Sequence, residues 1–448
     1  MRDISRSSRR APARPQPNTR IDPITGAVIQ GALESIAIEM GHKLMRMSYS
    51  SIIRESEDFG AALTDADGRQ LCECKMSTPL QSGPIPGYVR GIRKRFAARG
   101  DVFRPGDVIM HNDPYGGASH GPDVAFCVPV FDGSDLIGFS VTTAHHLDIG
   151  AHTPGSCGIV DAVDTYAEGL QFKAIKVIDQ GRRNDAVWHM VRDNIRIPDL
   201  VVGDMNAQIA AAQIGAQRFL DLVHRYGRDT VNGAYEDLMD YSERLMRRAI
   251  CDIPDGVYSA ETFIDGYLDD PDPARHDLKI AVAIKVKGDE LTVDLTGTSP
   301  QVADRPINMP FEGTVDVAVW LTVRSVLLDT AVCGHIPVND GLLRPIKITA
   351  PLGSLAKPGL SGTDDCPLLS RQSSRRYGNE GIGAGSPRSS FRRNRQSQGH
   401  RLLRHAKGQA LGSYGDLRGQ LRRPPRARRN GCSRHPLCEY AQQPNRGY

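Results

Sequence analysis

Residues 120–148 read HGPDVAFCVPVFDGSDLIGFSVTTAHHLD, and this stretch contains a hairpin together with groups that could do chemistry. One apolar run spans Val124 to Phe131 and a second spans Leu136 to Ala144, with the turn sequence Asp-Gly-Ser-Asp at 132–135 between them. Glycine adopts positive φ at little cost, so Asp-Gly between two such runs favours a tight turn. The stretch therefore predicts two antiparallel strands joined at residues 132–135.

Histidines and an aspartate lie at the open end of this predicted hairpin. His120 and Asp123 precede the first strand, and His145 and His146 follow the second. A hairpin brings its open ends together, so we expect a compact site of two imidazoles and one carboxylate. Such ligands suit Zn, Mn or Fe(II) and leave positions open for water or substrate. Adjacent residues of an extended chain point to opposite faces, so we expect one of His145 and His146 to be a ligand. The other would be a supporting partner or a proton carrier.

Each of these signals also has a structural alternative. Histidines at a strand end can simply hydrogen-bond the local backbone. Asp113 lies in Asn-Asp-Pro-Tyr-Gly-Gly at 112–117, where aspartate commonly caps backbone amides and glycine permits positive φ. On the residues alone, a turn is the favoured interpretation of that segment. The charged segment 54–58 is typical of a solvated helix end.

Outside residues 120–148, the sequence predicts helices and hairpins that interleave without a βαβ rhythm. An apolar stripe from Ile29 to Met47, with spacings of three and four, predicts a helix over 24–50. Asp-Gly at 67–68 predicts a second hairpin over 61–72. This order favours the α+β class. Further helices are expected at 204–226 (with Asp204 as N-cap), 229–250 and 314–329, and further strands at 107–110, 257–264, 278–286 and 291–295.

The net charge of +4 over 448 residues conceals segments of unlike composition. Residues 1–20 contain six Arg and one Asp, and residues 371–448 contain 17 Arg, one Lys and three acidic residues. The remainder has 32 basic against 48 acidic residues, a balance of −16. An acidic body of this kind is typical of an enzyme and not of a nucleic-acid-binding protein. We interpret residues 1–20 as a disordered basic leader.

The Arg-rich residues 363–448 permit two interpretations. Arginine density alone allows a basic arm for nucleic acid or another acidic surface. Alternatively, a GC-rich gene read out of frame produces such a mixture of Arg, Gly, Ser, Pro and Ala. Residues 371–448 contain no Val, Met or Trp and only four aromatic side chains, which gives little support for base stacking. We favour the out-of-frame interpretation, and we expect no ordered fold in this tail.

Cysteines and apolar runs limit the expected compartment. The nine cysteines form no Cys-x-x-Cys pair, and no run approaches the roughly 18 apolar residues of a membrane helix. Ser8-Arg9-Arg10 is not followed by an apolar segment, so it does not read as an export signal. We therefore expect a cytoplasmic protein with reduced thiols and no membrane partner.

Many short stretches together resemble one known family, hydantoinase B/oxoprolinase, whose members include N-methylhydantoinase B subunits, 5-oxoprolinases and alpha-type subunits of acetone and acetophenone carboxylases. The resemblance covers roughly residues 22–362. It rests on the following stretches: Glu39-Met40-Gly41, Ser48-Tyr49-Ser50, Ile53-Arg54-Glu55, Asp58-Phe59-Gly60-Ala61-Ala62, residues 65–68, Pro105-Gly106-Asp107, residues 112–117, His120 with Asp123, residues 145–150, Glu168-Gly169-Leu170, residues 194–198 and Gly203-Asp204-Met205-Asn206-Ala207-Gln208.

The resemblance implies a metal at His120, Asp123 and His145, with Mn as the carboxylase-like expectation and Zn or Fe as alternatives. It also implies that ATP is bound by a separate hydantoinase A-type subunit. No GxxxxGK[ST] phosphate loop or GxGxxG motif occurs here, which agrees with that division.

From these observations we predict the B-type subunit of an ATP-dependent cyclic amidase that hydrolyses a hydantoin- or oxoproline-like ring. His146 is the expected general base, Asp148 its orienting partner and Asp113 a further catalytic group. Arg54 and Asp58 are expected substrate contacts. Two alternatives remain open: an alpha-type subunit of a ketone carboxylase, and a non-catalytic binding protein with a basic tail.

The resemblance also divides the chain. Residues 21–362 are expected to form the catalytic region, and relatives continue well beyond residue 362 with structured sequence. If that part supplies catalytic or interface groups, we expect this chain to be inactive.

Overall fold

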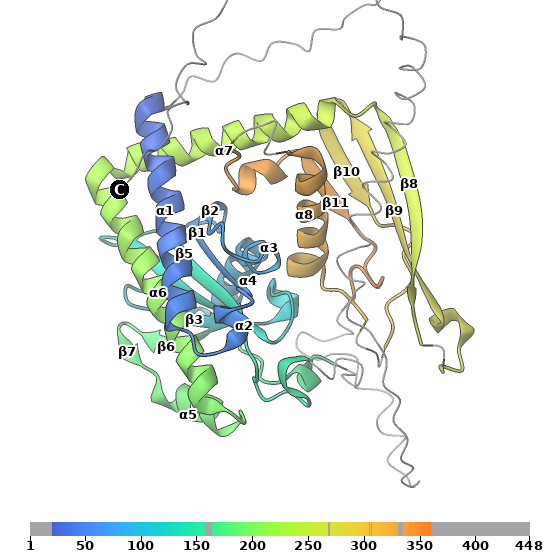
Figure 1. The fold of residues 1–448 in the computed structure, drawn as a ribbon, viewed down its shortest axis with the longest axis horizontal. Helices are drawn as coiled ribbons and strands as arrows, with labels where there is room; N and C mark the ends of the chain where they lie inside the picture. The colour runs from blue at the N-terminus through green and yellow to red at the C-terminus, as the bar shows by residue number, and fades with distance from the viewer. Residues whose placement is uncertain are drawn as a thin grey trace, which may run out of the picture. The chain divides into compact units, whose positions relative to one another are not determined.

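A computed structural model describes residues 20–156, 164–267, 269–303, 305, 307–329 and 335–359 (Figure 1). Nearly all of the predicted leader and the whole predicted tail at 363–448 lie outside these residues. In the described part of the chain, helices combine with one antiparallel sheet and one mixed sheet, which confirms the α+β class. No described helix is long and apolar enough to cross a membrane.

The larger sheet has seven strands in the order β2-β1-β5-β4-β3-β6-β7, and every neighbouring pair is antiparallel. The predicted central hairpin is β4 and β5, which lie in the middle of this sheet and pair along their whole length. The other strands of this sheet therefore lie on either side of the hairpin. The strand bounds are β1 Phe59–Asp65, β2 Gln70–Glu73, β3 Val108–His111, β4 Asp123–Asp132, β5 Asp135–His145, β6 Ile175–Asp179 and β7 Arg182–Arg183.

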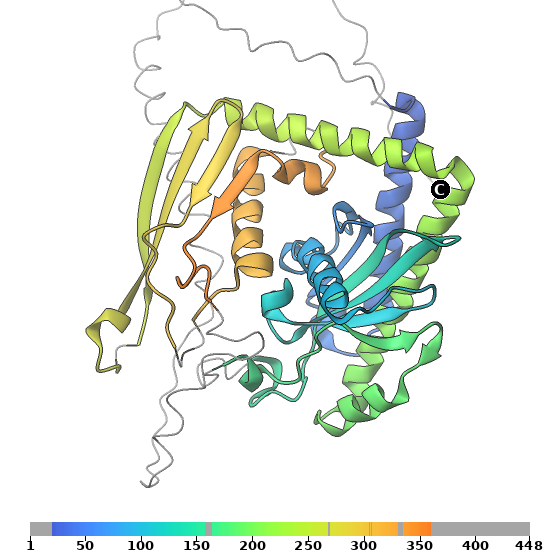
Figure 2. The same cartoon turned by 180° about the vertical axis from the view of Figure 1, so that it is seen from behind.

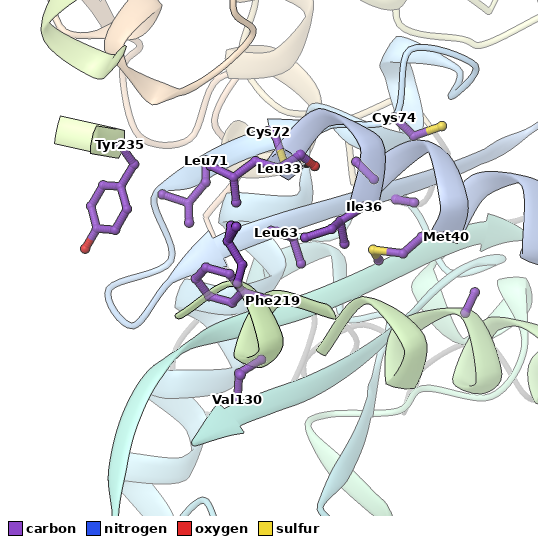
Figure 3. Packing of buried hydrophobic residues seen from close by; sticks show 14 of the residues in the cluster. Leu33, Ile36, Met40, Leu63, Leu71, Cys72, Cys74, Val130, Phe219 and Tyr235 are labelled. Carbon is purple, nitrogen blue, oxygen red and sulfur yellow. Dashed lines mark hydrogen bonds between the residues drawn. The ribbon is translucent and has the colours of Figure 1, made fainter. Parts of the chain in front are cut away.

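Helices cover both faces of this sheet. Helix α1 (Pro23–Met47) runs beside α6 (Pro198–Tyr226) on one face, and α4 (Ile85–Arg99) lies on the other, as Figures 1 and 2 show from opposite sides. Leu33, Ile36 and Met40 of α1 point towards Leu63 of β1 and Phe219 of α6 in the buried cluster between helices and sheet (Figure 3). The α1 stripe predicted from spacing is thus the side that packs on the sheet. Shorter helices are α2 (Ser51–Arg54), α3 (Pro79–Ser82) and α5 (Asp185–Asp193).

A second sheet has four strands in the order β11-β10-β9-β8, in which only the β10–β11 pair is parallel. Helix α7 (Arg228–Cys251) extends from the first sheet to the second, where Met246 and Ile250 join the apolar cluster beside α8 (Asp316–Leu327). The strands of this second sheet are β8 Gly256–Asp265, β9 Asp277–Lys287, β10 Glu290–Asp294 and β11 Ile346–Thr349. Short 3-10 turns occupy Pro114–Gly116, Pro154–Ser156, Thr165–Glu168, Pro273–Arg275 and Asp340–Leu343, and a π-helical segment occupies Phe311–Val315.

Two predicted helix ends were wrong. Helix α1 ends at Met47 because Ser48 has extended backbone, so the expected helix over 24–50 is followed by the separate helix α2. The expected start of a helix at Asp204 is wrong because α6 already begins at Pro198. Proline is favoured in the first turn of a helix, where its missing N–H costs nothing. Asp204 therefore lies inside α6 and does not cap it. Its carboxylate accepts hydrogen bonds from the Tyr49 and Ser50 amides.

Candidate metal centre

The register of the central hairpin places two of the predicted ligands side by side. Asp123, the first residue of β4, pairs directly with His145, the last residue of β5. Residues opposite each other in a ladder share one face of the sheet. The Asp123 carbonyl accepts a hydrogen bond of 2.8 Å from the Tyr88 hydroxyl of α4. Along β4, Ala125 and Cys127 pack in the cluster that contains residues of α4, whereas Val124 and Phe126 pack in the cluster that contains residues of α6. Because side chains alternate along a strand, those of Asp123 and of its partner His145 lie on the face that α4 covers.

His120 completes a set of three side chains around one carboxylate oxygen. Oδ1 of Asp123 lies 3.0 Å from Nε2 of His120 and 3.0 Å from Nδ1 of His145. The two imidazoles stack, with centroids 5.2 Å apart and planes inclined by 29°. The other Asp123 oxygen accepts a hydrogen bond from Ser119 Oγ. The structure thus brings together the three groups that the hairpin argument required.

The local electrostatics keep Asp123 charged. Burial of its carboxyl, which is 4% exposed, would raise its pKa, but the charges and hydrogen bonds of His120 and His145 outweigh burial and hold the pKa well below its usual range. Asp123 is therefore a carboxylate at neutral pH. This is the protonation state that binds a cation.

The donor set fits a divalent metal. One ligand atom from each of His120, Asp123 and His145 lies within 4.8 Å of the other two, so a single ion could contact all three after small rotamer adjustments. The His120 side chain is 31% exposed and that of His145 is 12% exposed, so one side of the set faces solvent. Two imidazoles and a carboxylate with an accessible side are typical of Zn, Mn or Fe(II) sites that admit water or substrate.

Two more carboxylates surround this set. The first is Glu168, whose Oε1 lies 3.9 Å from Nδ1 of His120. Its other oxygen, Oε2, accepts a hydrogen bond of 2.9 Å from the Gly121 amide. The second is Asp58, whose backbone carbonyl accepts a hydrogen bond of 3.2 Å from the backbone amide of His145. Burial, and then the charge of Asp123, raise the pKa of the half-buried Asp58 carboxyl. Arg54, the other predicted substrate contact, is an exposed residue at the end of α2.

His146 lies on the opposite face of the sheet, as the alternation argument predicted. Its Nε2 is 2.8 Å from Oε1 of Gln208 on α6, and its side chain is 1% exposed. Nδ1 of His146 is buried, and no hydrogen-bond partner for it occurs among the described residues. Burial lowers the pKa of His146 despite the nearby Asp204 charge, so this imidazole is neutral at neutral pH.

The expected pairing of His146 with Asp148 does not occur. Asp148 accepts hydrogen bonds from the backbone amides of Gly150 and Arg196, and its carboxylate forms a 3.0 Å ion pair with the Arg196 guanidinium. The local amides and the arginine satisfy both carboxylate oxygens. Gln208, and not Asp148, therefore orients His146.

Asp113 likewise lies outside the ligand set. Its carboxylate accepts a hydrogen bond of 3.1 Å from the Tyr115 amide at the start of the 3-10 turn. The same carboxylate forms an ion pair of 3.0 Å with Nη2 of Arg95. Gly117 ends that turn at φ 97°. The turn interpretation of 112–117 is confirmed, and the expectation of Asp113 as a further catalytic group finds no support in its contacts.

Sequence reasoning overlooked several groups that hold the centre together. Ser119 is adjacent to His120, so a search for hydroxyls next to the ligands would have found it. Glu168 and Gln208 lie in stretches that carried the family resemblance, but nothing in their spacing indicated a contact with the hairpin. Tyr88 reaches Asp123 from a helix that the sequence analysis did not predict.

Comparisons with known proteins show which family the chain resembles. The family model for hydantoinase B/oxoprolinase matches residues 22–362. The chain is 68% identical over 339 residues to the B subunit of a "Putative D-/L-hydantoinase" of Pseudomonas sp. (strain NS671), covering 76% of this chain and 57% of that protein. It is 32% identical over 338 residues to the caprolactamase beta subunit of Pseudomonas jessenii, covering 75% of this chain and 55% of that one. The chain thus spans little more than half the length of these relatives.

Two solved structures share the fold. The ATP-dependent caprolactamase from Pseudomonas jessenii superposes with a TM-score of 0.66 at 30% identity, covering 76% of this chain and 56% of that chain. A nucleotide-free acetone carboxylase superposes with a TM-score of 0.67 at 19% identity, covering 75% of this chain and 44% of that chain. At that identity, the second likeness shows the fold alone.

Proposed function

Because the chain belongs to the hydantoinase B/oxoprolinase family, we propose that it is the B-type subunit of an ATP-dependent cyclic amidase, which hydrolyses a C–N bond of a hydantoin- or oxoproline-like ring. The observation that carries this proposal is the 68% identity to a protein named as the B subunit of a hydantoinase. The caprolactamase relatives, one of them titled ATP-dependent, support a cyclic amide as the substrate class.

A divalent metal, Mn, Zn or Fe, is part of the proposal. His120, Asp123 and His145 would hold it, and Ser119 and Tyr88 keep Asp123 in place. When bound, such an ion polarises a carbonyl or phosphoryl oxygen or lowers the pKa of a bound water. The partly exposed side of the set, at His120, is where a ring carbonyl could approach.

The polar groups around the set suggest distinct roles. Asp58 lies on the ligand side with a raised pKa, so we assign it the contact with the ring N–H or a transferred proton. Arg54, four residues earlier, remains a proposed contact for an anionic part of the substrate. His146 is almost fully buried on the far face, so we assign it a supporting role in place of the general base.

ATP and a second subunit complete the proposal. The relatives are named as B and beta subunits, which implies a partner chain in each case, and we propose that ATP binds to a hydantoinase A-type subunit. In this division of labour the partner activates the amide oxygen, and the residues described above orient the ring for opening.

Reconstitution with an A-type subunit tests the proposal. We expect ring opening of a substituted hydantoin or of 5-oxoproline that consumes ATP, requires both subunits and does not depend on bicarbonate. If the complex instead consumes a ketone and requires bicarbonate to do so, the chain is a carboxylase subunit and not an amidase subunit. Salt-dependent nucleic-acid binding, with no turnover in the presence of the partner and metal, would instead indicate a binding protein.

A further inference from the structure

Helix α6 contributes two buried polar side chains, one helical turn apart, to the interior beside the metal centre. Asp204 is 1% exposed and Gln208 is 0% exposed. A buried polar group is costly unless it is hydrogen-bonded, so the partners of these side chains matter. Of the two Asp204 oxygens, Oδ1 is hydrogen-bonded, and Oδ2 is buried without a partner among the described residues. Neither residue is a ligand, and the sequence analysis assigned neither one a role at the metal centre.

Gln208 makes three hydrogen bonds to the two central strands and their ends. Its Oε1 lies 2.8 Å from Nε2 of His146, and its Nε2 donates to the Val124 carbonyl at 2.9 Å. Its backbone carbonyl accepts from the Thr142 hydroxyl at 3.1 Å. One residue of α6 therefore binds β4, β5 and the residue that follows β5.

The partners determine how the Gln208 amide is oriented. The Val124 carbonyl can only accept, so the amide NH₂ must face it, and the amide oxygen must face His146. An amide oxygen cannot donate, so the His146 hydrogen is on Nε2. Nδ1 of His146 then carries a bare lone pair.

Both side-chain contacts of Gln208 are next to metal ligands. Val124 follows Asp123 directly, and His146 follows His145 directly. Gln208 thus spans the mouth of the hairpin from the α6 face, while the three ligands meet on the α4 face. Rotation or separation of the strand ends would move Asp123 and His145 apart.

Asp204 acts in the same way on a neighbouring segment. Its Oδ1 accepts hydrogen bonds from the backbone amides of Tyr49 and Ser50 at the start of α2. The segment continues to Asp58, whose carbonyl binds the His145 amide. Gly203 leaves room for this approach, because a Cβ there would lie 2.6 Å from the Tyr49 ring.

We infer that Gln208 is a positioning residue of the metal centre, which holds Asp123 and His145 at binding distance through Val124 and His146. The inference rests on the proposed metal centre, and it extends that proposal to a residue on α6, which is distant in the chain from all three ligands. Loss of groups that orient metal ligands typically weakens metal binding about 10- to 100-fold.

Gln208→Met in the full chain tests the inference, because methionine keeps the buried volume and removes both side-chain hydrogen bonds. We expect Mn²⁺ or Zn²⁺ affinity, measured by titration calorimetry, to fall about 10- to 100-fold. Gln213→Met is the matched control, since Gln213 is exposed on the same helix, and its metal affinity should equal that of the wild type. Gln208→Asn keeps one amide but is too short to reach both partners, so it should give an intermediate loss.

A second readout separates positioning from general packing and does not require metal. In metal-free protein labelled with ¹⁵N-histidine, His146 should show a protonated Nε2 and an unprotonated Nδ1, and this pattern should be lost in Gln208→Met. If the wild type binds neither ion, the proposed metal centre fails and the inference fails with it, and the ¹⁵N pattern then tests only whether Gln208 orients His146. A folded Gln208→Met or Gln208→Asn variant with wild-type metal affinity and a wild-type His146 pattern would overturn the inference.

Discussion

At the scale of single residues, the centre depends on one carboxylate shared by two imidazoles. Asp123 Oδ1 lies 3.0 Å from a nitrogen of both His120 and His145. The sequence predicted this set because the two ends of a hairpin must meet, whichever helices surround it. It could not predict that Asp148 and Asp113 would bind Arg196 and Arg95, because those arginines come from other elements.

The depressed pKa of Asp123 has a consequence for stability. A carboxyl whose pKa is lower in the folded than in the unfolded state stabilises the fold above its unfolded pKa of about 3.9, and this contribution is lost as the pH falls towards the folded pKa. We expect metal-free Asp123→Asn to be less stable than the wild type at pH 7, and the difference to shrink below about pH 4. Urea unfolding of both proteins across this range measures it. A difference independent of pH would show that the Asp123 charge contributes nothing.

At the scale of elements, the central hairpin was predictable and its surroundings were only partly so. Local signals, namely the Asp-Gly turns and the apolar stripe of α1, predicted β4, β5 and the packed side of α1. The pairing of β1 with β5 joins residues some 80 positions apart, and no local pattern indicates such a partner. The start of α6 was misplaced because Asp204 resembles an N-cap, although it caps a different segment.

Asp204 supplies a prediction at this scale. Asp204→Ala leaves the amides of Tyr49 and Ser50 without their acceptor, and a buried unsatisfied donor costs about 1–3 kcal/mol. We expect the free energy of unfolding to fall by that amount in denaturant titrations. Asp199→Ala is the control. Asp199 also lies on α6 and forms an exposed ion pair with Arg192 of α5, so its loss should change stability by less than about 0.5 kcal/mol. Equal effects of the two substitutions would refute the role of Asp204.

At the scale of the whole molecule, the charge of +4 divides into an acidic body and basic ends, and the described fold occupies the acidic body. The metal ligands lie between residues 120 and 145, and the last described strand is β11 (Ile346–Thr349). The family match covers residues 22–362. The division of the chain at residue 362 stays a prediction. Composition and apolar periodicity change near that residue, but neither could supply the order of strands in either sheet.

A deletion tests whether residues 363–448 contribute to the metal centre. If residues 363–448 contribute nothing to the centre, a chain ending at residue 362 should bind Mn²⁺ or Zn²⁺ with the same affinity as the full chain, within about twofold. Calorimetric titration of both proteins compares them directly. A markedly weaker affinity in the shorter chain would show that residues beyond 362 support the site.

Metal analysis of the purified full chain tests whether His120, Asp123 and His145 form a metal centre. We predict about one Mn, Zn or Fe per chain by inductively coupled plasma mass spectrometry, lost in His120→Ala and retained in His152→Ala, since His152 is an exposed histidine outside the ligand set. Absence of stoichiometric metal in the wild type, or unchanged metal content in His120→Ala, would show that these residues do not form a metal centre.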